Sequence, residues 1–145
     1  MKPFKLEAVL GHRKRSENSA QKELLASLDT KEEIIRIKAQ EEVEMARLYQ
    51  ELGEAKTNEV SVSDLLLYES CICCKKREVR KLDQQLLEMD ATIKRKRQKL
   101  VLARQEKRAL EIVKESRQKQ EKQKQKHLED LFFDEVAVLC FGSGK

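Results

Sequence analysis

The sequence predicts an all-α fold, a long two-helix antiparallel coiled-coil hairpin with an extended C-terminal helix. Three observations predict it: a heptad-spaced apolar seam in the second half, a glycine-containing polar segment before it, and a looser apolar pattern in the first half. Residues that repeat every ~3.5 positions keep one stripe facing a partner helix. We expect a single rod over residues 1–145, with helices at about 4–52 and 62–139, a loop at about 53–61 and a flexible tail at 140–145.

The first helix is predicted over residues 4–52. Pro3 suits a helix start, because proline is tolerated in the first turn, and apolar residues then recur at helical spacings up to Leu52. Two polar gaps, at 13–19 and 29–33, interrupt the pattern, so contact with a partner helix should be weaker there. Gly53 is expected to end the helix.

The second helix should begin near residue 62, because Ser61 and Asp64 form a capping box. A short polar loop folds the two helices back on each other. With the turn centred near residue 58, facing residues have numbers that sum to about 116, which pairs Leu48 with Tyr68 and Leu6 with Leu110.

The seam of the second helix contains fourteen positions, reached from Leu65 by alternate steps of three and four residues. Eleven are apolar, and the other three are lysines with long aliphatic stems. No proline or glycine interrupts it. The positions are Leu65, Tyr68, Ile72, Lys75, Val79, Leu82, Leu86, Met89, Ile93, Lys96, Leu100, Ala103, Lys107 and Leu110. Past Leu110 the seam positions turn polar, so we expect the basic stretch 114–127 to be a single, solvated helix.

Composition and charge narrow the class of protein. Charged residues make up 39% of the chain and aromatic residues 4%, which fits a rod better than a compact globule. Residues 94–126 carry fourteen basic and four acidic groups, so one end of the hairpin is strongly cationic. We favour a solvated face, or a face for an acidic protein partner, over nucleic-acid binding at this end, because no aromatic platform accompanies the basic residues.

The start lacks a signal peptide, and the longest apolar run, Val136–Phe141, is far shorter than the ~20 residues that span a bilayer. We expect a soluble cytoplasmic protein with reduced cysteines. The segment Leu128–Phe141 fits a protein groove better than a membrane surface, because it carries four acidic groups and no basic face.

Cysteines cluster at Cys71, Cys73 and Cys74, the one feature that suggests chemistry. A structural zinc site needs four ligands, and the nearest histidine, His127, is far along the helix. We therefore predict no metal site and no cofactor. With two histidines far apart and no pocket-forming fold, we also predict no catalytic residues, no small-molecule substrate and no enzymatic activity.

Three stretches, in order along the chain, resemble the family of the flagellar export protein FliJ. They are Phe4–Leu10 followed by His12-Arg13, the helix entry Ser61–Glu69, and the close Phe133–Val138. The resemblance implies a coiled-coil stalk that docks into the hexameric export ATPase, stimulates it, and links it to the membrane protein of the export gate and to export chaperones. It also implies a cytoplasmic protein held peripherally at the inner membrane through its partners.

We expect two contact surfaces from the hairpin and this resemblance. Residues expected to contact the ATPase ring are Val9, Leu10, Leu131, Phe132 and Val138, and those expected to face the gate are Tyr49, Tyr68 and Ile72. Stalk proteins of virulence type III secretion share the architecture, so the choice between the two systems stays open. The alternative function is a generic coiled-coil adaptor or a nucleic-acid-associated rod.

Overall fold

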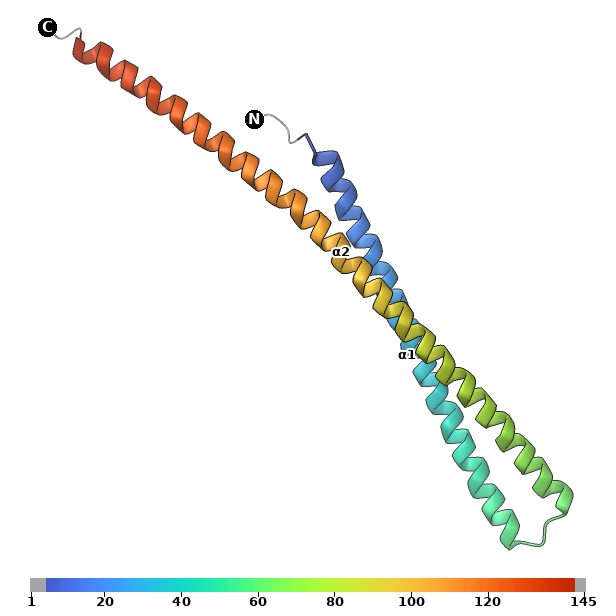
Figure 1. The fold of residues 1–145 in the computed structure, drawn as a ribbon. Helices are drawn as coiled ribbons and strands as arrows, with labels where there is room; N and C mark the ends of the chain where they lie inside the picture. The colour runs from blue at the N-terminus through green and yellow to red at the C-terminus, as the bar shows by residue number, and fades with distance from the viewer. Residues whose placement is uncertain (1–4, 143–145) are drawn as a thin grey trace. The chain divides into compact units, whose positions relative to one another are not determined.

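The computed structural model describes residues 5–142, which form two helices, α1 (Glu7–Thr57) and α2 (Val62–Gly142), joined by residues 58–61. The helices pack against each other in antiparallel directions (Figure 1), and the described residues contain no strand. The predicted all-α hairpin is confirmed. The predicted helix start at Phe4 lies outside the described residues, as do residues 143–145 of the predicted tail. Residues 140–142, predicted as part of the flexible tail, instead belong to α2.

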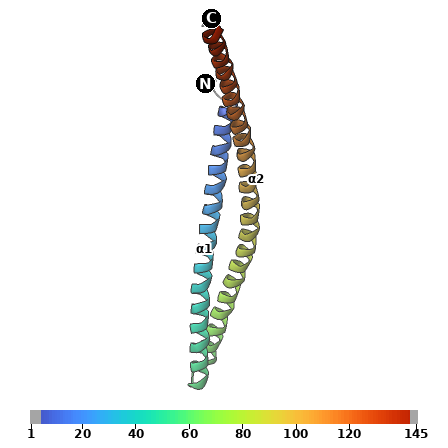
Figure 2. The same cartoon turned by 90° about the vertical axis from the view of Figure 1, so that its left-hand side faces the viewer.

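Contacts group the chain into two compact units. The loop unit comprises residues 18–101 and contains the connection between the helices. The terminal unit comprises the described parts of Met1–Glu17 and Leu102–Lys145. In the loop unit, the two helices run side by side from the connection (Figure 2).

The seam predicted for α2 is the face that the structure buries. All fourteen seam positions are buried or half-buried, and Thr92 is the one other residue between Leu65 and Leu110 that is not exposed. The most buried seam residues in the loop unit are Ile72, Leu82, Ile93 and Leu100. The burial is a narrow strip because each helix has one neighbour, as expected for a two-helix coiled coil.

The buried face of α1 is more polar than the sequence suggested. It follows a strict heptad spacing from Leu6 to Ala55, and charged or polar residues occupy several of its positions. Exposed residues include Val43 and Tyr49, which belong to the looser apolar pattern but lie outside this face. The polar members of the buried or half-buried face are Arg13, Glu17, Ser27, Lys31, Lys38 and Glu41.

The two polar gaps of α1, where contact with the other helix was expected to be weaker, each hold an ion pair to α2. Within the first gap, Arg13 forms an ion pair with Glu106. Within the second, Lys31 Nζ lies 2.7 Å from Asp90 Oδ1. The contacts were not visible in the sequence because each partner lies on the other helix.

Gly53 does not end α1, which continues to Thr57. Glycine costs a helix interior only about 1 kcal/mol relative to alanine, and the residues that follow, Glu54, Ala55 and Lys56, favour helix. The helix ends one turn later, where the Thr57 hydroxyl donates to the Glu54 carbonyl at 2.7 Å. The loop is therefore shorter than the predicted 53–61.

The start of α2 agrees with the predicted cap. The helix begins at Val62, and the Asp64 amide donates to the Ser61 hydroxyl at 3.3 Å. This bond satisfies one of the amide groups that a helix start leaves without a partner inside the helix.

Ion pairs between the helices set a different register from the predicted one. In the terminal unit, Glu7 contacts Lys114 at 3.0 Å; in the loop unit, Lys38 contacts Asp83 at 2.6 Å. The numbers of each pair sum to 121 rather than 116. The register differs because α1 continues past Gly53, which moves the turn toward higher residue numbers. Leu6 therefore does not face Leu110.

In the terminal unit, α2 continues well past the start of α1 (Figure 1). From Glu115 to Gly142 every residue of α2 is exposed except Glu121, which is half-buried. This agrees with the expectation that the basic stretch after Leu110 is a single, solvated helix. We call residues 115–142 the α2 extension.

Candidate partner-binding surfaces

The α2 extension is an exposed surface with a distinct chemical pattern. Apolar residues recur at steps of three and four, which places them on one side of a helix with ~3.6 residues per turn. Phe132 and Phe133 contact each other edge to face, with ring centroids 6.1 Å apart. The residues of this apolar side are Leu128, Leu131, Phe132, Val136 and Leu139, all exposed.

Charge divides the α2 extension into two sections. Residues 115–127 carry five basic and two acidic groups, and residues 128–142 carry four acidic groups and no lysine or arginine. The extension therefore presents a cationic section nearer the paired helices and an acidic section with the apolar side beyond it. Such a surface can bind other proteins by both charge and apolar contact.

Four of the five residues predicted for the ATPase-ring contact are available on the surface. Val9 is 41% exposed, and Leu131, Phe132 and Val138 are more exposed still. Leu10 is 2% exposed and packs inside the terminal unit, so its side chain contributes to the hairpin and not to a free surface. Val9 and the C-terminal residues lie in the same unit.

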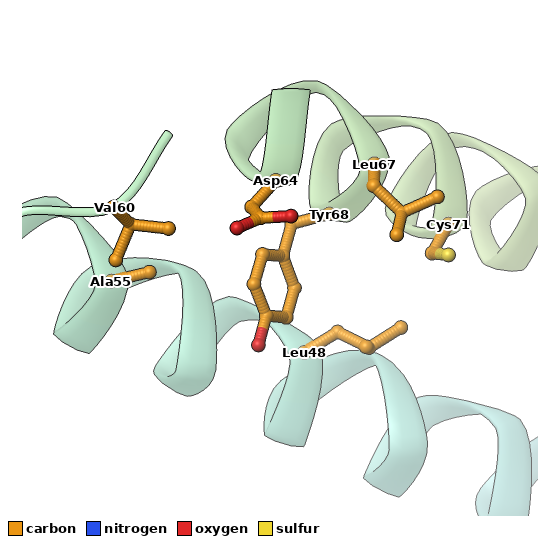
Figure 3. Close-up of a pocket in the computed structure, with 7 residues that line it drawn as sticks. All are labelled: Leu48, Ala55, Val60, Asp64, Leu67, Tyr68 and Cys71. Carbon is orange, nitrogen blue, oxygen red and sulfur yellow. The ribbon is translucent and has the colours of Figure 1, made fainter. Parts of the chain in front are cut away.

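The other candidate surface lies in the loop unit beside the connection, where a pocket of about 330 Å³ opens between the helices. Figure 3 shows the Tyr68 ring directed from α2 toward Leu48 of α1. Leu48 and Tyr68 thus both line one pocket, although the shifted register does not make them the facing pair that the sequence predicted. The pocket is lined by Leu48, Ala55, Val60, Asp64, Leu67, Tyr68 and Cys71.

The three residues predicted to face the export gate differ in exposure. Tyr49 is exposed, and the Lys76 ammonium lies 5.6 Å from the centre of its ring. Tyr68 is half-buried at the pocket. Ile72 is 5% exposed and belongs to the seam. Sequence reasoning did not identify Asp64 and Leu67 as residues that line this pocket. Asp64 belongs to the predicted cap, and Leu67 lies three positions after it.

Charged residues within the seam are held by groups on the opposite helix. Lys75 Nζ lies 2.8 Å from Glu41 and 2.6 Å from Glu44, and the hydrogen bonds to these carboxylates raise the pKa of Lys75. Lys107 Nζ lies 2.5 Å from Glu17, and this hydrogen bond is the main cause of the lowered pKa of Glu17. The ammonium groups of Lys75 and Lys107 therefore each have a carboxylate partner on α1, and these ion pairs help to hold the helices in register.

The cysteines do not assemble into a metal centre within residues 5–142. Cys71, Cys73 and Cys74 form no disulfide, and these three cysteines and Cys140 are all exposed. The described part of the chain holds no group of three or more histidine, cysteine or acidic side chains arranged to bind a metal ion. Neither described helix has an apolar stretch of the length that crossing a bilayer requires.

The fold defines a coiled-coil protein built from two long helices packed against each other. The family model of the flagellar FliJ protein matches residues 1–145, the whole chain, and the chain belongs to this family. The resemblance seen in the sequence is confirmed, and it identifies the chain as a flagellar export-related stalk protein. No curated protein and no solved structure matches the chain.

Proposed function

We propose that this protein is a non-catalytic stalk that docks into the hexameric flagellar export ATPase and stimulates ATP hydrolysis. The observation that carries the proposal is the α2 extension, a helix that stays exposed along residues 115–142 and keeps an apolar side. A solvated helix with exposed Leu131, Phe132 and Val138 is suited to bury these side chains in a partner.

Charge supports a ring as the partner. The cationic section of the α2 extension adjoins the start of α1 in the same unit, where Lys114 pairs with Glu7. An acidic lining of the ring would attract this end and orient it, which speeds association more than it tightens binding. The apolar side of residues 128–139 and Val9 would supply the desolvated contact.

The loop unit is proposed to link the ATPase to the export gate. Exposed Tyr49 and the pocket at Tyr68 offer an aromatic surface beside the connection. Aromatic side chains with a polar group are enriched at protein interfaces. Binding to the gate membrane protein would hold a cytoplasmic protein peripherally at the inner membrane. Export chaperones are proposed as further partners of the same assembly.

A steady-state ATPase titration with the purified hexameric export ATPase tests the proposal. The full chain should raise the hydrolysis rate and hydrolyse no ATP alone, while deletion of 128–145 and added salt should both weaken the stimulation. Substituting Tyr49 and Tyr68 should leave stimulation intact and impair secretion.

Phe132→Glu and Leu87→Glu form a matched pair for this titration, because the two side chains are 62% and 66% exposed. The first should reduce stimulation and the second should not, since Leu87 lies in the loop unit. An unchanged rate at saturating stalk, with binding confirmed independently, would contradict the activator role and leave an adaptor.

A further inference from the structure

Two α2 extensions that run in opposite directions have complementary charge patterns. Residues 115–127 are cationic overall, and residues 128–142 carry only acidic charges. Two extensions packed in parallel would place like charges together, which is unfavourable. Two extensions packed antiparallel would place the cationic section of each against the acidic section of the other.

The heptad spacing of the α2 seam also continues through the extension. From Leu110, alternate steps of four and three residues reach Lys124, Leu128, Leu131 and Glu135. Two leucines in the middle, flanked by a lysine on one side and a glutamate on the other, form a short, self-complementary seam. In the loop unit, Lys75 occupies a seam position in the same way and is satisfied by Glu41 across the interface.

We propose that the α2 extension binds the α2 extension of a second copy of this chain in antiparallel orientation. The two-fold axis lies between Leu128 and Leu131. Leu128 then faces Leu131 of the second copy, and Lys124 faces Glu135 of the second copy. Because the interface is two-fold symmetric, each of these contacts occurs twice.

This arrangement leaves the hairpin intact. The ion pair of Glu7 with Lys114 joins the first turn of α1 to α2. When Lys124 lies opposite Glu135 of the second copy, Gly142 of the second copy lies opposite residue 117 of the first. The described part of the second helix therefore ends before it reaches Lys114. The interface is short, so we expect an association that depends on protein concentration.

Self-association would cover the side of α2 that holds Leu131 and Phe132. The dimer and a ring-bound stalk would then exclude each other, and this consequence rests on the proposed function. The self-association itself does not. Sedimentation of the chain alone tests the self-association without the ATPase, so failure of the self-association and failure of the proposed function are distinguishable.

The experiment is sedimentation equilibrium of the full chain, from about 1 µM to about 500 µM. Lys124→Glu and Glu135→Lys should each weaken the dimer about tenfold at low salt, because two attractive pairs become repulsive. The double variant should restore it. Lys124 and Glu135 are eleven positions apart, about 16 Å along one helix, so a restored dimer reports a contact between two chains.

Lys119→Glu is the matched control. It makes the same change of charge in the same section, but position 119 lies on the opposite side of the helix from Leu128. This variant should dimerise like the unaltered chain, and the effect of Lys124→Glu should shrink at high salt.

A monomer at all concentrations would overturn the proposal and leave this side of α2 to other partners. A dimer that the single variants do not weaken, or that the double variant does not restore, would overturn the antiparallel arrangement.

Discussion

Replacing Leu82 with alanine should lower the free energy of unfolding by about 2 kcal/mol. Leu82 is a seam residue of the loop unit and is 9% exposed. The change removes three carbon atoms from a nearly buried position, each contributing about 0.8 kcal/mol. Alanine regains a few tenths of a kcal/mol, roughly, through its higher helix propensity. Cores of compact domains lose more, about 2–5 kcal/mol, because a cavity remains, whereas a two-helix interface lets water reach the gap.

Leu87→Ala is the matched control, since it changes the same residue type in the same helix and unit. Leu87 is 66% exposed, so the same reckoning gives a loss of at most about 0.8 kcal/mol. Urea and thermal unfolding followed by far-ultraviolet circular dichroism measure both variants. Equal losses from the two substitutions would refute the reasoning, because they would mean that the seam is not the stabilising strip.

Three further predictions concern the turn and the ion pairs. Gly53→Ala should raise the free energy of unfolding by about 0.5–1 kcal/mol in urea titrations, because Gly53 lies inside α1 and a Cβ there meets no atom within 4 Å; a loss would mean that the helix ends there. Ser61→Ala should cost about 1 kcal/mol in the same titrations by removing the cap of α2, and no change would show that the cap is dispensable. The pKa of Glu17 is lowered by its hydrogen bond with Lys107 and the pKa of Lys38 is raised by that with Asp83. The stabilisation from Glu17 is therefore complete above about pH 4.5 and lost as pH falls, and that from Lys38 is complete below about pH 10.5 and lost as pH rises. Thermal midpoints measured across pH should be flat between these limits and fall outside them.

The sequence predicted α2 better than α1 for a physical reason. In α2 the buried side is made of apolar residues and long-stemmed lysines, so spacing within one helix reveals it. In α1 the buried side includes Glu17, Ser27 and Lys38, whose burial depends on partners about 45 to 90 positions away in the sequence. These partners are Lys107 for Glu17, Lys96 for Ser27 and Asp83 for Lys38. Spacing within one helix cannot reveal such partners.

The turn shows how one residue changes a register. Gly53 was interpreted as the end of α1, yet a single glycine is too weak a signal to end a helix whose following residues favour it. The helix end at Thr57 and the cap at Ser61 together place the turn. The error at Gly53 therefore passed into the predicted pairing of every facing residue.

The candidate surfaces were predictable in kind and less so in detail. The loss of seam character after Leu110 indicated an unpaired helix, and residues 115–142 are exposed with the exception of half-buried Glu121. Burial of Ile72 follows from its seam position, whereas burial of Leu10 was less predictable, because Leu10 lies beside exposed Val9 and only the register separates the two. The pocket at Tyr68 depends on how the two helices meet and has no sequence motif.

Photo-crosslinking within the stalk–ATPase complex tests directly whether the α2 extension is the part of the stalk that enters the export ATPase. A photoreactive amino acid is placed at Phe132 or at Leu87, two positions of similar exposure, 62% and 66%. If the α2 extension enters the ATPase, we expect a crosslink to the ATPase from position 132 and none from position 87. A crosslink from position 87 without one from position 132 would contradict it.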